Sequence, residues 1–393
     1  MIRSLFIFGT RPEAIKLCPV IRHMISRPDD FGVSVCVTAQ HREMLDQVLN
    51  AFEVIPQRDL DIMRPGQTLY QSTSRIIAAL ESVLEEEKPD IVLVQGDTTT
   101  TFCGALAAFY AKMRVGHVEA GLRTGDPLQP FPEEMNRILT GRLATLHFAA
   151  TEGAAQNLYR EAVDPATVTV TGNTGIDAVL HVKEALDAGK LIGLNGFHTD
   201  TSKKLIVVTA HRRESFGAGF EGICVALARL ARRDDVEIVY PVHPNPNVRQ
   251  TVNRHLGGRP NITLIEPMDY VPFVDLMCRA YLLLTDSGGI QEEAPSLGKP
   301  VLVLREKTER PEAVSAGTAR LVGTSERRIV DEAERLLDDP NAYQRMARRH
   351  NPYGDGKASE RIADVLAGGT AEFARIRLGD LVPVEIQTQA GCS

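Results

Sequence analysis

Acidic residues, a serine and glycines stand together where an apolar segment ends. Asp286-Ser287-Gly288-Gly289 follows the apolar run 281–285 and precedes a stretch with helical periodicity. Two glycines let a backbone approach a ligand closely, and free N–H groups at a helix start favour an anion. Glu292 and Glu293 would either stabilise the helix start or accept hydrogen bonds from a ribose. We interpret this segment as a nucleotide or sugar-phosphate loop, ahead of a simple tight turn.

Three carboxylates in the first half have positions that suit acid–base chemistry. Asp97 and Glu119 each follow a predicted strand, and Glu133 follows a proline at a predicted helix start. Each taken alone is also typical of helix capping or helix-dipole stabilisation. Carboxylates close together in space raise one another's pKa, which supplies a proton donor and a proton acceptor near neutral pH. Together they indicate a proton-transfer site.

Cationic side chains also follow predicted strands. Such a group either clamps an anion or is a solvated surface cation, and a strand's carboxyl end favours the clamp. A lone histidine is more often structural than catalytic, but two at one edge of a sheet favour a functional role. The residues in question are Arg11, Lys16, His211, His243 and Arg310.

Several classes of protein are disfavoured. The first strand-to-helix turn has no G-x-G-x-x-G motif, which argues against an NAD enzyme, and no H-E-x-x-H-type spacing indicates a metal site. The absence of Gly-x-Ser-x-Gly disfavours a serine hydrolase. A net charge of −7 argues against a nucleic-acid partner. We therefore expect neither a metal nor a redox cofactor.

Composition favours a reduced, cytoplasmic, globular protein. Hydrophobic residues make up 43% and charged residues 24% of 393 residues, enough for two domains. The six cysteines form no Cys-x-x-Cys pair. We also expect no signal peptide and no membrane-spanning segment, because the apolar runs are short.

The elements that must position these residues alternate between short apolar runs and amphipathic stretches of helical length. The pattern predicts a doubly wound parallel sheet, with its loops at the carboxyl ends of the strands. After the loop-like segment 191–202 the pattern starts again, which predicts a second α/β domain facing the first across a cleft. The missing periodicity of 368–393 indicates a tail, which we expect to be flexible and to which we assign no function. The predicted strands are 4–8, 33–38, 91–94, 115–118, 146–149, 167–171, 205–209, 237–240, 262–265, 281–284 and 301–304.

Ten motifs in this chain are similar to those of one enzyme family. They are GTRPEAIK, TAQHREMLDQV, GDTTTT, GHVEAGLRTGD, PFPEEMNR, TAHRRESFG, PVHPNPNV, TDSGGIQEEAPSLGKPV, TERPEA and NPYGDG. These motifs occur in the family's order from residue 5 to about 367, so the chain resembles the non-hydrolysing bacterial UDP-N-acetylglucosamine 2-epimerases.

The resemblance implies a GT-B architecture of two Rossmann-like domains, 1–170 and 171–350, with a helical segment 351–367 returning to the first. It implies a homodimer that interconverts UDP-GlcNAc and UDP-ManNAc without NAD or metal, for surface polysaccharide synthesis. The implied acid–base and leaving-group residues are Asp97, Glu119, Glu133 and His211. The implied substrate contacts are Arg11, Lys16, His243, Phe273, Ser287, Gly288, Gly289, Glu293 and Arg310.

Some family members bind a second UDP-GlcNAc as an activator. The matching segment here contains Gln40, His41 and Glu43, but Gly66 stands where those members have an arginine. Gly66 supplies no such cation, which argues against substrate activation but leaves it as an alternative.

Three other functions stay open. A hydrolysing epimerase would release free ManNAc, and a GT-B glycosyltransferase would need a separate acceptor surface. A non-catalytic UDP-sugar-binding module would catalyse nothing.

Overall fold

The computed structural model describes residues 1–38, 42–62, 64, 66–212 and 216–368. Its first domain is built on a seven-stranded parallel sheet with the order β3-β2-β1-β4-β5-β6-β7. The strands are β1 (Ile2–Phe8), β2 (Phe31–Val37), β3 (Arg58–Asp59), β4 (Ile91–Gln95), β5 (Arg114–Ala120), β6 (Leu146–Ala149) and β7 (Val168–Val170).

Helices cover both faces of this sheet because successive side chains of a strand point to opposite faces. Phe6 and Phe8 of β1 pack with α1, α2, α7 and α15, whereas Leu5 and Ile7 pack with α3 and α4. The helices of this half are α1 (Arg11–Ile25), α2 (Arg42–Ala51), α3 (Leu69–Glu87), α4 (Thr99–Tyr110), α5 (Glu133–Leu143), α6 (Glu152–Arg160) and the short η1 (Pro165–Thr167).

The second domain is built on a six-stranded parallel sheet with the order β10-β9-β8-β11-β12-β13. Its strands are β8 (Lys204–Thr209), β9 (Val236–Pro241), β10 (Ile262–Ile265), β11 (Leu282–Thr285), β12 (Val301–Val303) and β13 (Ala319–Leu321). Its helices are α8 (Ala218–Leu230), α9 (Pro246–Leu256), α10 (Tyr270–Arg279), α11 (Gly288–Glu293), η3 (Ala294–Leu297), α12 (Pro311–Ala316), α13 (Glu326–Asp338) and α14 (Pro340–Ala347).

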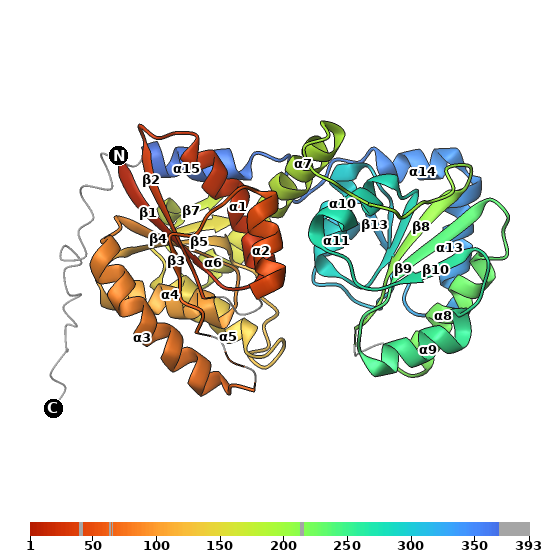
Figure 1. Cartoon of the computed structure of the whole chain (residues 1–393), viewed down its shortest axis with the longest axis horizontal. Coiled ribbons are helices and arrows are strands. Elements are labelled where there is room, and N and C mark those ends of the chain that lie inside the picture. Colours follow the sequence, from red (N-terminus) through yellow and green to blue (C-terminus); the bar gives the residue numbers. More distant parts are fainter. Residues whose placement is uncertain (39–41, 63, 65, 213–215, 369–393) are drawn as a thin grey trace, which may run out of the picture.

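Two helices join the halves. Figure 1 shows two lobes, with α7 (Thr174–Asp187) between them and the blue helix α15 (Ala358–Gly368) back on the lobe that holds the N-terminus. The carboxylate of Asp177 on α7 accepts hydrogen bonds from the N–H groups of Ala358 and Ser359, at 3.2 and 2.7 Å. The guanidinium of Arg27 reaches Asp364 at 2.6 Å. These contacts hold the end of the described chain on the first domain.

The expected fold class, two Rossmann-like domains of GT-B type, is confirmed. Each predicted strand is present with ends shifted by a few residues, while β3 and β13 were not predicted. These two strands have two and three residues, too short to produce an alternating pattern. The domain limits at residues 170 and 350 stay predictions. Among the described residues, no helix combines the length and apolar character needed to cross a bilayer.

Strand order places the candidate loops. It reverses between β1 and β4 in the first sheet and between β8 and β11 in the second. Ligands of such sheets bind at these switch points, outside the carboxyl ends of the strands. The loops beginning at Gly9 and Gly96 flank the first switch point. Those beginning at Ala210 and Asp286 flank the second.

Candidate active site

The turn after β1 is packed too tightly for any residue but glycine. A Cβ on Gly9 would lie 2.1 Å from Oγ1 of Thr38 and 2.8 Å from Oγ1 of Thr100. The backbone can therefore pass between two threonines before α1 begins. This turn sets the direction from which Arg11 and Lys16 project.

Glu13 fastens that turn to the neighbouring loop. Its buried carboxylate accepts hydrogen bonds from the N–H groups of Gly9 and Thr10, at 3.1 and 2.8 Å. It also accepts from the hydroxyls of Thr98 and Thr101, at 2.7 and 3.1 Å. Burial raises the pKa of Glu13, although hydrogen bonds from Thr10, Thr98 and Gly9 oppose the shift. Sequence reasoning missed this residue, whose signal is the capping-box spacing Thr10-x-x-Glu13.

Glu119 has an unusual backbone conformation at the end of β5. Its φ angle is +62°, and the pairing of β5 with β6 shifts register between Val118 and Ala120. A bulge of this kind redirects a side chain, and a non-glycine residue with positive φ is typical of functional sites. The Glu119 carboxylate accepts a hydrogen bond from Lys16 on one oxygen and from Gln95 on the other.

Lys16 lies among carboxylates from both domains. Burial by itself would lower the pKa of Lys16, but the charges of Glu119 and Glu292 outweigh it, so the pKa is raised. Arg310, in the second domain, behaves in the same way. Burial opposes the charges of Glu292 and Glu119, which raise the pKa of Arg310. Both cations therefore stay protonated at any physiological pH.

These four residues form an alternating charge cluster between the domains. The first domain contributes Lys16 and Glu119, and the second contributes Glu292 and Arg310. Glu292 pairs with the guanidinium of Arg310 and accepts a hydrogen bond from the amide of Asn173 at 2.8 Å. Because like charges would repel in this buried setting, the alternation lets two cations lie near one another.

Asp97 follows β4 and is bound by α5. Its carboxylate pairs with the guanidinium of Arg137 at 2.5 Å, and its backbone carbonyl accepts from the amide of Asn136 at 2.9 Å. Glu133 is the first residue of α5 and is half-buried. The start of α5 thus lies beside the loop of Asp97. Gly96, the preceding residue, has Oε2 of Glu119 3.6 Å from where its Cβ would lie.

Asp286 binds the loop that carries His211. Its buried carboxylate accepts hydrogen bonds from the N–H groups of His211 and Arg212, at 2.6 and 2.7 Å. Its other oxygen lies 3.5 Å from Nδ1 of His211. Sequence reasoning placed Asp286 in the glycine-rich loop but did not anticipate that it reaches across from β11 to β8.

The two candidate histidines stack on each other. The ring centroids of His211 and His243 are 5.1 Å apart, and the ring planes are inclined by 7°. Burial lowers the pKa of His211, His243 and Arg212 lower it further, and Asp286 opposes them. His243 is exposed and accepts the N–H of Asn245 at Nδ1, at 3.1 Å. The predicted convergence of the two histidines is therefore present in the structure.

The glycine-rich loop leaves space beside a cation and an acid. A Cβ on Gly288 would lie 3.6 Å from the Arg310 guanidinium, and one on Gly289 would lie 3.7 Å from Oε1 of Glu293. Ser287 makes no side-chain capping bond to α11. Burial and the charge of Glu292 raise the pKa of Glu293 to about 8, although Lys16 and Arg11 oppose the shift. Arg11 of the first domain therefore lies within electrostatic reach of the second.

The structure shows fewer interactions for the remaining residues that were predicted to bind substrate or activator. Phe273 lies on α10, partly buried against the main core cluster. Gln40 and His41 lie outside the described residues, and for Glu43 only its position in α2 is described. Gly66 has a φ of +74° and open space where a Cβ would lie. The roles predicted for all these residues stay predictions.

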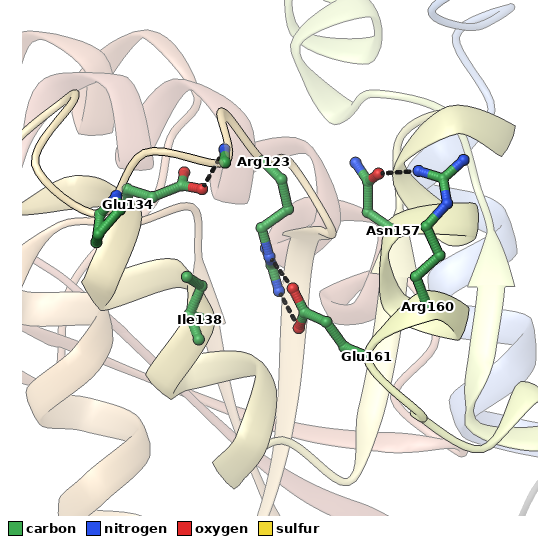
Figure 2. Close-up of a pocket in the computed structure, with 8 residues that line it drawn as sticks. Arg123, Glu134, Ile138, Asn157, Arg160 and Glu161 are labelled. Carbon is green, nitrogen blue, oxygen red and sulfur yellow. Dashed lines mark hydrogen bonds and ion pairs between the residues drawn. The ribbon is translucent and has the colours of Figure 1, made fainter.

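A separate cavity of about 310 Å³ lies under the loop that joins β5 to α5. Figure 2 shows Arg123 paired with Glu161, and Glu134 turned toward the loop backbone. Glu134 accepts the N–H groups of Thr124 and Gly125, each at 3.0 Å. The residues that line this cavity support the loop that precedes Glu133. Within the described ranges no group of three or more His, Cys, Asp or Glu side chains could hold a metal ion.

Fold and site together define a class: a two-domain α/β protein of GT-B type with acids, histidines and cations gathered at the switch points of its two sheets. The comparisons agree. Residues 23–367 match the family described as UDP-N-acetylglucosamine 2-epimerase. The UDP-N-acetylglucosamine 2-epimerase of Escherichia coli K12 is 59% identical over 369 residues, which are 93% of this chain and 98% of the relative.

Solved structures show the same likeness. A putative UDP-N-acetylglucosamine 2-epimerase from Listeria monocytogenes has a TM-score of 0.87 at 46% identity, covering 94% of this chain and 97% of that one. The UDP-GlcNAc 2-epimerase of Neisseria meningitidis, bound to UDP-GlcNAc, has a TM-score of 0.83 at 48% identity, covering 93% and 100%. This chain belongs to the UDP-N-acetylglucosamine 2-epimerase family, as its motifs predicted.

Proposed function

We propose that this protein interconverts UDP-GlcNAc and UDP-ManNAc by inverting carbon 2 of the sugar. The observation that carries the proposal is the charge cluster of Lys16, Glu119, Glu292 and Arg310, in which each domain supplies one cation and one carboxylate. A diphosphate between the domains would meet both cations, and the sugar would meet Glu119. The similar Neisseria protein was crystallised with UDP-GlcNAc.

The chemistry explains why cations and acids are needed together. The proton on carbon 2 is not acidic in the substrate, because no carbonyl group is adjacent to that carbon. When the bond between carbon 1 and the diphosphate oxygen breaks, its electron pair leaves with UDP and an oxocarbenium-like centre forms. This centre acidifies the proton on carbon 2, and a carboxylate then removes it. The products at this stage are UDP and 2-acetamidoglucal.

Return of a proton to the opposite face, with re-addition of UDP at carbon 1, gives the epimer. Proton transfer at two faces requires at least two groups, and we propose that these come from Asp97, Glu119 and Glu133. Lys16, Arg310 and His211 would stabilise the charge on the departing diphosphate. Arg11, His243, Phe273, Ser287, Gly288, Gly289 and Glu293 would hold the rest of the nucleotide sugar.

Incubation with UDP-GlcNAc in deuterated water tests this function. We expect deuterium at carbon 2 of intact UDP-sugar and a mixture of both epimers. Free ManNAc as the main product would instead indicate a hydrolysing epimerase. An absence of deuterium at carbon 2 would contradict epimerisation by proton exchange.

We also propose that two copies associate through the face formed by α3, α4 and α5. These helices pack side by side and lie together in the lower part of the left lobe in Figure 1. They carry exposed apolar side chains, among them Tyr70, Phe109, Tyr110 and Leu139. Exposed apolar side chains on neighbouring helices are a feature that an interaction surface would use.

The product would supply the synthesis of a surface polysaccharide, and we place the enzyme in the cytoplasm. Free thiols support that compartment, because disulfides are rare in reducing surroundings. Cys18, Cys36, Cys103, Cys224 and Cys278 are all unpaired.

A further inference from the structure

Gln95 is a buried polar residue that the proposed chemistry does not yet use. It is the last residue of β4, its side chain is almost inaccessible to solvent, and its amide nitrogen donates a hydrogen bond to Oε2 of Glu119. A buried amide at a strand end that donates to a carboxylate can orient it, because buried polar groups need defined partners.

The two donors to Glu119 differ in what a substrate would do to them. Lys16 is a cation, and the diphosphate of a bound nucleotide sugar would compete for it. Gln95 is neutral and is anchored by its own backbone, since its carbonyl accepts the hydroxyl of Thr101 at 2.6 Å. A ligand that attracts Lys16 would therefore leave the contact from Gln95 in place.

Local geometry brings Glu119 to this amide. Gln95 is the register partner of Val118 on the neighbouring strand, so the two side chains share a face of the sheet. In a regular strand Glu119, the next residue, would point to the opposite face. The register shift after Val118 and the φ of +62° at Glu119 turn its carboxylate back toward Gln95.

We infer that Gln95 is a positioning residue for Glu119. It holds Oε2, so that Oε1 faces the sugar as the proton-transferring oxygen once the diphosphate has drawn Lys16 away. This inference rests on the proposed function, and it assigns the reactive oxygen within that function.

The charged groups around Glu119 are known, so an experiment can separate the effect of the Gln95 hydrogen bond from the effect of charge. The charged groups that face it are Lys16 from α1 and Arg310 before α12, with Glu292 of α11 beside both cations. On its own strand, burial lowers the pKa of His117 to about 3, so that ring stays neutral. The Gln95→Met substitution removes a neutral donor and introduces no charge, whereas Gln95→Glu adds a carboxyl group at the same place.

The test compares Gln95→Met and Gln95→Glu with wild type in epimerisation, in exchange at carbon 2 and in UDP binding. Loss of a hydrogen bond to a charged group predicts a fall in kcat of about tenfold to a hundredfold for Gln95→Met, with the Kd for UDP within about twofold. The acid limb of the pH profile of kcat should move to higher pH, because the carboxylate loses a donor. Gln95→Glu, nearly isosteric, should move that limb further.

Gln57→Met, the same substitution at an exposed glutamine, is the control. The Gln57 side chain accepts the N–H of Val35 and donates to the carbonyl of Ile55, but it lies before β3 and away from the site. It should leave the acid limb in place. If Gln95→Met destabilises the fold, the pH profile of kcat for Gln95→Glu still shows whether the acid limb has moved.

The outcomes separate the two proposals. A wild-type protein that neither epimerises nor exchanges at carbon 2 contradicts the proposed function itself. A wild-type protein that epimerises, with Gln95 variants whose acid limb does not move, overturns the inference and assigns Gln95 a structural role only. When Gln95→Met is added to Glu119→Gln, kcat should be no lower than in Glu119→Gln alone. A further fall in kcat would also overturn the inference.

Discussion

Asp286 reaches His211 twice: its Oδ2 accepts the backbone N–H of His211 at 2.6 Å, and its Oδ1 lies 3.5 Å from the ring nitrogen Nδ1. One buried carboxylate thus holds the loop by hydrogen bonds and lies within ion-pair distance of the imidazole. This relationship joins the carboxyl ends of β11 and β8, the two strands at the switch point of the second sheet.

We expect Asp286→Asn to reduce the contribution of His211 to catalysis while leaving its loop in place. The amide oxygen can still accept the backbone N–H groups, but the negative charge that opposes the lowering of the His211 pKa is lost. The pKa of His211 should fall further, and less of the charged ring should be present at neutral pH. NMR titration of the ring measures this directly, and kcat should fall about tenfold to a hundredfold. An unchanged titration of His211 would contradict the role given to Asp286.

Lys16→Met should weaken UDP binding. The variant removes a cation that a diphosphate would contact and leaves Glu119 and Glu292 with one counter-charge fewer. Loss of a charge-assisted hydrogen bond predicts a rise in Kd of about tenfold to a hundredfold, measurable by calorimetry. Lys183→Met is the control, because the pair of Lys183 with Asp187 is exposed and of little energetic weight. Equal UDP affinity in wild type and Lys16→Met would refute the contact.

The raised pKa of Glu293 predicts that the free energy of unfolding depends on pH. Its pKa is about 8 in the folded protein and 4.5 without the surroundings of the fold. Between these two values the unfolded chain loses the proton while the folded protein keeps it. The free energy of unfolding therefore falls as pH rises from about 4.5 to about 8, and this contribution is constant outside that window.

Urea unfolding at pH 5 and pH 8 measures this effect. Glu293→Gln, which cannot ionise, should lose less stability over that interval than wild type. If both proteins show the same change, the carboxyl of Glu293 is ionised well below neutral pH.

Asp177→Ala should loosen the return of the chain to the first domain. The variant removes the acceptor for the N–H groups of Ala358 and Ser359 at the start of α15. Loss of such a cap lowers the free energy of unfolding by about 0.5–2 kcal/mol. Asp177→Asn keeps an acceptor oxygen and should lose less. Hydrogen exchange in α15 should rise in Asp177→Ala, and unchanged protection there would show that the cap is unimportant.

Tyr110→Glu should disrupt association of two copies. Tyr110 is exposed at the end of α4, and a buried charge without a partner would oppose packing of this face. Light scattering should report a dimer for wild type and a smaller species for the variant. Ile192→Glu, which changes an exposed apolar residue outside α3, α4 and α5, should remain dimeric. A monomeric wild type would reject the dimer altogether.

The sequence by itself determined the fold class, the positions of most strands and the family. Periodic burial is a local property, so β1, β4 and β5 could be recognised from a few residues each. Motifs that follow strand ends place Asp97, Glu119 and His211 at the edges of sheets for the same reason. The short strands β3 and β13 carry too few residues for such a signal.

Only the tertiary structure decided which side chains meet and what charge they keep. Lys16 and Glu119 are 103 residues apart, and Asp286 and His211 are 75 apart. Such pairs depend on how strands are ordered and how helices pack, which local periodicity does not encode. The raised pKa of Glu293 likewise arises from burial beside Glu292. Desolvation and neighbouring charge are properties of the packed molecule, so they exist only once both domains have folded.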